Sequence, residues 1–165
     1  MSMVINGSGT ITGLSAGGLP SATVTQATLA TPIAGTGPAF SAYQSIPQTP
    51  ATGTWTKLTF TTKDFDTNSN FASSTFTPTV AGYYQVNAQA QVGATSSSIS
   101  VSIYKNGAAY KSGTYIVTSA SYNASIASIL VYCNGTTDYI DAYVYIGTSG
   151  ALNAAQFSAS MVRSA

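Results

Sequence analysis

The chain has 165 residues, of which 44% are hydrophobic and 5% are charged, so it is long and apolar enough to form one core. Histidine is absent and the four acidic residues are all aspartates, which excludes Ser-His-Asp and Cys-His catalysis. The net charge is +1 and the five basic residues are dispersed, so we expect no nucleic-acid partner. No apolar run approaches the ~20 residues of a membrane span, and we expect no signal peptide and no cofactor.

Residues 1–36 differ from the rest of the chain because they are uncharged and rich in glycine, serine and threonine. The segment buries too little apolar surface to fold alone. Two interpretations are open: a flexible linker, or a segment that docks on a partner through its apolar side chains. The docking interpretation rests on Ile5, Ile11, Leu14, Leu19, Val24 and Leu29. We therefore predict a docking or linker segment at 1–36 and a folded domain at 37–165.

The folded domain shows strand patterns separated by turn signals. Residues 58–61 and 98–103 alternate apolar and polar side chains, which predicts strands with one face in a core and the other toward solvent or a neighbour. The Asn-Gly pairs at 106–107 and 134–135 predict tight turns. Because no helical periodicity of useful length occurs, we predict an all-β sandwich or jelly roll.

A long strand that follows residue 82 has two different faces. Its apolar face consists of Tyr84, Val86, Ala88, Ala90 and Val92, which we expect in the core. Its other face consists of Tyr83, Gln85, Asn87, Gln89 and Gln91, which a lone domain would expose to solvent.

Three segments resemble, in order, the C1q/TNF-like domain: GPAFSAY at 37–43, FTPTVAGYY at 76–84 and IYKNG at 103–107. The resemblance spans residues 37–163 and implies a C1q/TNF-like jelly-roll sandwich that forms a homotrimer and functions by binding. It places the amide face of the long strand around the threefold axis, where uncharged amides meet without like-charge repulsion.

The same resemblance adds parts of the first and last strands to the trimer contact. In the last strand, Phe157, Ala159 and Met161 are expected to face the core. The interface that the resemblance implies consists of Ala39, Ser41, Tyr43, Tyr83, Gln85, Asn87, Gln89, Gln91, Ser158 and Ser160.

The N-terminal segment has a resemblance of its own. Residues 7–30, which begin GSGTITGL and continue with GGLP and VT, are similar to a segment of bacteriophage tail-fibre and other virion appendage proteins. This resemblance implies location in a virion and docking on other virion proteins through the apolar residues of the segment.

Tyrosines form a second candidate surface. Tyr139, Tyr143 and Tyr145 share one face of the strand predicted at 138–146. They are either cross-strand pairs of an ordinary sheet or a stacking surface for sugars and protein loops. The first interpretation is favoured because such pairs stabilise a solvated sheet without any ligand.

Two further features carry alternatives. Residues 64–70 place oxygen-bearing side chains at alternate positions, as at the start of a calcium loop, but Ser69 and Thr75 replace the required glycine and acid. A solvated Asx-rich turn is therefore favoured over calcium. Cys133 is the single cysteine and lies in an apolar stretch, which is typical of a small buried hydrophobe.

These features together predict a non-enzymatic virion protein: a short docking segment that carries a trimeric head for binding a host-surface glycan or protein. One alternative is a capsid decoration or head-fibre protein that stabilises the particle without a ligand. A remote alternative is a polysaccharide depolymerase, because glycoside hydrolysis requires only two carboxylates.

Overall fold

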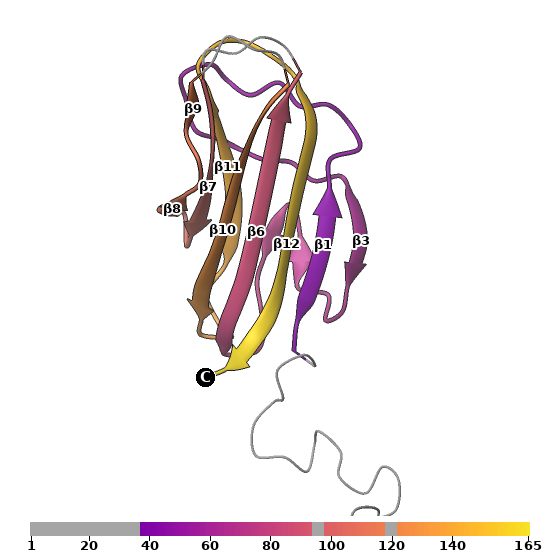
Figure 1. Cartoon of the computed structure of the whole chain (residues 1–165). Coiled ribbons are helices and arrows are strands. Elements are labelled where there is room, and N and C mark those ends of the chain that lie inside the picture. Colours follow the sequence, from indigo (N-terminus) through magenta and orange to yellow (C-terminus); the bar gives the residue numbers. More distant parts are fainter. Residues whose placement is uncertain (1–36, 94–97, 118–121) are drawn as a thin grey trace, which may run out of the picture. The chain divides into compact units, whose positions relative to one another are not determined.

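The computed structural model describes residues 37–93, 98–117 and 122–165. They form two antiparallel sheets that pack face to face (Figure 1). One sheet has five strands in the order β10-β6-β12-β1-β3, and the other contains β4-β5-β11-β7-β8, with β2 paired to β11 and β9 paired to β7. The described ranges contain no helix, so they include none that crosses a membrane.

The strands have the following bounds: β1 Ala39–Tyr43, β2 Thr56–Lys57, β3 Thr62–Asp66, β4 Phe71–Ala72, β5 Thr75–Phe76, β6 Gly82–Val92, β7 Ser98–Lys105, β8 Ala108–Ser112, β9 Ile116–Val117, β10 Asn123–Cys133, β11 Ile140–Ile146 and β12 Leu152–Ser164.

The core lies between the two sheets and is filled by side chains from alternate strand positions. Phe40 stacks on Phe71 at 4.3 Å between ring centroids and meets the edge of Phe157 at 5.0 Å. Tyr84 is fully buried, and its hydroxyl donates a hydrogen bond to the Val80 carbonyl at 2.7 Å, so its polar atom is satisfied in the core. Cys133 is also fully buried and unpaired, as predicted.

Strand β6 confirms the predicted division into two faces. Tyr84, Val86, Ala88, Ala90 and Val92 are buried, whereas the residues between them are half-buried or exposed. In β12, Phe157, Ala159 and Met161 are buried as well, as predicted. The Asn-Gly pair at 106–107 forms the expected hairpin turn: both residues have positive φ, and the flanking Lys105 and Ala108 pair.

Two strand predictions are wrong in part. Residues 58–61 alternate in burial as predicted, with Leu58 and Phe60 inside, but they form no strand. They carry the chain from β2 in one sheet to β3 in the other, so they cannot continue either ladder. In β7 the serines at 98, 100 and 102 were expected to face solvent or a neighbour, yet they are buried as deeply as the isoleucines and valine between them.

The predicted tight turn at 134–135 is also wrong. Asn134 and Gly135 lie in a six-residue connection from β10 to β11, and these two strands belong to different sheets. A two-residue hairpin joins only adjacent strands of one sheet. Gly135 nevertheless needs to be glycine, because its φ is +74° and an added Cβ would lie 2.5 Å from the Ala81 nitrogen.

Candidate binding surfaces

The residues of the predicted trimer contact all lie on the outward face of the five-stranded sheet, which faces the viewer in Figure 1. Across the β6–β12 pair, Gln85 lies opposite Ser160 and Asn87 opposite Ser158. Ser158 in turn lies opposite Ser41 of β1. The strand register therefore brings three distant segments into one continuous polar band, which we call the amide band.

Hydrogen bonds within the amide band extend to β10. The Gln85 side-chain amide donates to the Ser128 hydroxyl at 3.0 Å, and this hydroxyl donates to the Asn87 amide oxygen at 2.7 Å. At the far side of the band, the Ser41 hydroxyl donates to Asp64 at 2.7 Å. The amide band is thus polar. The carboxylate that bonds to it, Asp64, lies on the edge strand β3.

This face also has an apolar part, which strand alternation did not reveal. Ile126, Leu130 and Tyr132 of β10 and Val162 of β12 project outward and are 51%, 52%, 41% and 43% exposed. Tyr132 lies opposite Tyr83 of β6, with ring centroids 5.4 Å apart. The nearly continuous apolar run at 129–133 was the available signal, since such runs are typical of strands covered on both faces.

Near the C-terminus this apolar part surrounds a hollow of about 690 Å³. We call it the lower hollow. It is lined by Tyr83, Leu130, Tyr132, Val162, Arg163, Ser164 and Ala165.

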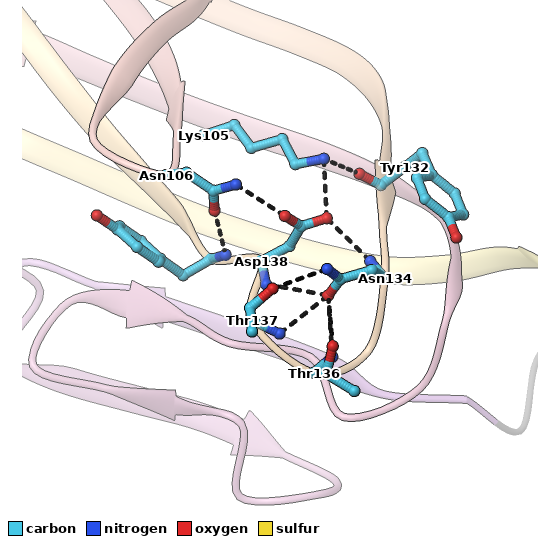
Figure 2. Close-up of polar contacts among 8 residues, drawn as sticks. Lys105, Asn106, Tyr132, Asn134, Thr136, Thr137 and Asp138 are labelled. Atoms are coloured by element: carbon cyan, nitrogen blue, oxygen red, sulfur yellow. Dashed lines mark hydrogen bonds and ion pairs between the residues drawn. The ribbon is translucent and has the colours of Figure 1, made fainter.

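A polar cluster fixes the end of β10 that carries Tyr132 (Figure 2). The buried Asp138 carboxylate accepts hydrogen bonds from the Asn106 side chain at 2.7 Å and the Asn134 backbone at 2.9 Å, and it lies 2.9 Å from the Lys105 ammonium. Lys105 also donates to the Tyr132 carbonyl at 2.7 Å. This cluster ties the β7–β8 turn to the β10–β11 connection through bonds among its own polar groups.

The hydrogen bonds and the lysine charge of the cluster determine the pKa of Asp138. Burial alone raises the pKa of Asp138, but the hydrogen bonds from Asn106, Lys105 and Asn134 and the charge of Lys105 outweigh burial. The pKa of Asp138 therefore lies below the ordinary value. Burial likewise raises the pKa of Cys133 to about 11, which keeps this thiol protonated and unreactive at neutral pH.

Asp66 is engaged in the same way. Asp66 accepts the backbone N–H groups of Asn70 and Phe71 and lies 3.2 Å from Lys63, and these bonds hold its pKa below the ordinary value against the opposing effect of burial. This is the Asx turn that was favoured over a calcium loop. Among the described residues, no group of three or more metal-binding side chains occurs. A glycosidase acid needs a raised pKa, whereas those of Asp66 and Asp138 are lowered.

The second candidate surface lies on the outward face of the seven-stranded sheet. Tyr143 and Tyr145 project from β11 and are half-buried, while Tyr139 precedes the strand. Tyr143 stacks on Tyr104 of β7 at 3.9 Å between centroids, and burial raises the pKa of both tyrosines. This pair fits the favoured interpretation of ordinary cross-strand contacts.

Tyr145 also contacts rings that strand alternation did not reveal. It lies 5.8 Å from Trp55 and 6.3 Å from Tyr115, and Trp55 in turn lies 6.5 Å from Tyr104, all measured between ring centroids. Trp55 precedes β2 and Tyr115 precedes β9, so three segments far apart in sequence supply the three rings. No local pattern could bring them together. The predicted docking residues of the N-terminal segment lie outside the described residues, and their role stays a prediction.

Solved structures share this arrangement of strands at low sequence identity. The globular domain of zebrafish complement 1qA matches with a TM-score of 0.64 at 17% identity, over 78% of this chain and 99% of that chain. Murine APRIL matches with 0.56 at 10% identity, over 74% and 98%, and PRD1 vertex protein P5 with 0.58 at 16% identity, over 76% and 96%. No family model and no curated protein matches the chain. Its described residues therefore have the C1q/TNF-like jelly-roll fold.

Proposed function

We propose that the protein is a non-enzymatic structural and binding protein that assembles as a homotrimer through the outward face of the five-stranded sheet. The observation that carries this proposal is the composition of that face: uncharged amides in the amide band, and exposed Leu130, Tyr132 and Val162 around the lower hollow. A large exposed apolar patch beside matched polar groups is typical of a protein–protein contact. At the amide band, identical copies meet without like-charge repulsion because the amides are neutral.

We further propose that this trimer belongs to a virion and binds a host-surface glycan or protein. The support is the similarity of residues 7–30 to virion appendage proteins and the shared fold of PRD1 vertex protein P5. In this proposal the N-terminal segment docks on other virion proteins through its apolar residues. The seven-stranded sheet of the folded domain then faces the host.

Light scattering of the purified full-length protein tests the assembly. The chain mass is 16.8 kDa, so we expect a particle of three times that mass at micromolar concentration, and a monomer would overturn the proposal. Immunogold labelling of intact particles tests the location. Label on a tail or on a capsid would support the virion proposal and would distinguish a tail fibre from a capsid protein. Unlabelled particles would contradict the proposal.

A further inference from the structure

Trp55, Tyr145 and Tyr115 form a row across the outward face of the seven-stranded sheet, which we call the aromatic row. Trp55 and Tyr115 are the outer members, 36% and 59% exposed, and Tyr145 lies between them at centroid distances of 5.8 and 6.3 Å. Cross-strand pairing within a sheet explains Tyr104 and Tyr143, which stack closely. It does not explain the outer members of the row, because they project from segments outside the strands and remain exposed.

The backbone on both sides of the row is fixed. The loop before Trp55 is held by a hydrogen bond from the Gly53 nitrogen to the Ile146 carbonyl at 2.8 Å. The segment before Tyr115 is held by bonds from Gly113 to Val101 at 2.8 Å and from Thr114 to Ile126 at 3.2 Å. An ordered backbone lowers the conformational entropy that a ligand must remove on binding. The aromatic row is thus preorganised for ligand binding.

The charges next to the row are neutralised. Lys57 follows Trp55 by two residues, and its ammonium lies 2.7 Å from Asp141 and 2.6 Å from the Thr75 hydroxyl. The other side chains around the exposed tryptophan are the rings of Tyr104 and Tyr145, at 6.5 and 5.8 Å between centroids, and the hydroxyls of Thr54 and Thr56. An anionic ligand gains little from a lysine that is already paired with a carboxylate, so the surroundings match a neutral ligand rich in hydrogen-bonding groups.

We propose that the aromatic row binds a neutral oligosaccharide. Aromatic rings stack on the apolar faces of sugar rings. The Thr54 and Thr56 hydroxyls donate to the Thr52 and Thr54 carbonyls at 3.4 Å, so they meet the sugar hydroxyls as acceptors. A protein partner fits less well, because the strongest protein contacts are aromatic residues enclosed by other apolar side chains, whereas threonines flank Trp55. The inference rests on the proposed function and names the chemical class of the host-surface ligand. It does not depend on the trimer, because all three rings of the aromatic row belong to one chain.

Tryptophan fluorescence provides a direct test because Trp55 is the only tryptophan in the chain. Full-length protein is titrated with hexasaccharides of glucose, galactose and mannose, and with heparin as an anionic probe. We expect at least one neutral hexasaccharide to change the emission of Trp55 at millimolar concentration, with little dependence on salt. Emission that stays unchanged with all three neutral probes would overturn the proposal, and so would salt-sensitive binding of heparin alone.

Variants then assign the binding to the row, with ligand-observed NMR as the readout. Trp55→Ala and Tyr115→Ala should each weaken binding by about tenfold or more, and Trp55→Phe should retain most of it. Tyr110→Ala is the matched control, since Tyr110 is 43% exposed on β8 and lies outside the row. Equal loss in the control would contradict the assignment.

Light scattering of the same samples separates this inference from the proposed function. A trimer that binds no neutral oligosaccharide would overturn the aromatic-row proposal and leave the trimer intact. A monomer that binds one would do the reverse. If Tyr115→Ala reduces the particle mass, the row is a contact between copies of the chain, and the saccharide proposal is wrong.

Discussion

At the scale of single residues, the few charges of this chain are used to hold the fold together. Three lysine–aspartate pairs, Lys57–Asp141, Lys63–Asp66 and Lys105–Asp138, account for six of the nine charged residues. In each pair the aspartate side chain is the more buried partner. Breaking such a pair leaves a charge with reduced access to water, which costs more than the pair itself contributes.

The first prediction concerns Asp138→Asn. The substitution removes the carboxylate that bonds to Asn106, Asn134 and Lys105, so we expect the free energy of unfolding to fall by about 2–4 kcal/mol. Asp64→Asn is the control, because Asp64 is exposed and accepts one bond from Ser41; its effect should stay within about 0.5 kcal/mol. Denaturant unfolding measures both, and equal effects would contradict the role of the cluster.

The same residue predicts a pH dependence. Because the pKa of Asp138 is lowered on folding, its contribution is fully present above the pKa of the unfolded chain, about 4. It is lost as the pH falls from there through the lower pKa of the folded state. Unfolding measured between neutral pH and about pH 2 should therefore show a smaller loss of stability in Asp138→Asn than in the natural chain.

At the scale of elements, alternation in the sequence predicted which side of β6 and β12 is buried. The strand predicted at 58–61 and the tight turn predicted at 134–135 are wrong because the chain passes there from one sheet to the other, and local sequence signals carry no information about sheet membership. The cluster around Asp138 was equally out of reach. Lys105 and Asn106 are more than thirty residues away from their partner, and only the fold brings them together.

The second prediction concerns Gly135 in the connection between the sheets. Gly135→Ala adds two costs: a positive φ of +74° and a contact of 2.5 Å between the new Cβ and the Ala81 nitrogen. Gly53→Ala is a matched control with a φ of +71° but no atom within 4 Å, so we expect about 1–2 kcal/mol there and about 3 kcal/mol or more at Gly135. Thermal unfolding measures the difference. Equal destabilisation would show that the close approach is relieved by backbone movement.

At the scale of the whole molecule, the two sheets offer two outward faces of different chemistry. Strand alternation identified the amide face of β6, because it gives the composition of a face directly, and the family resemblance added residues of β1 and β12 to it. Alternation missed Ile126, Leu130 and Tyr132, because β10 is apolar on both sides and its outward face is not evident from polarity. Strand alternation likewise identified Tyr145 without its neighbours in the aromatic row, since Trp55 and Tyr115 join it only through long-range contacts.

The last prediction tests the amide band through Asn87→Asp. Asn87 is exposed, and its amide oxygen accepts the Ser128 hydroxyl, a bond that a carboxylate can also accept, so the fold of one chain should be unchanged. In a trimer closed around this face the substitution brings three negative charges together, at a cost of several kcal/mol by order of magnitude. We therefore expect light scattering to give a monomer mass at pH 7.

Below about pH 4 the introduced carboxylates become neutral, and the trimer mass should return. The natural chain at both pH values shows whether acid itself affects assembly. Asn68→Asp is the matched control, because Asn68 is exposed in the turn after β3 and outside the amide band. It should remain trimeric throughout. A stable trimer of Asn87→Asp at pH 7 would mean that the chains do not meet at the amide band, and Leu130→Asp would then test whether they associate through the lower hollow of the same face.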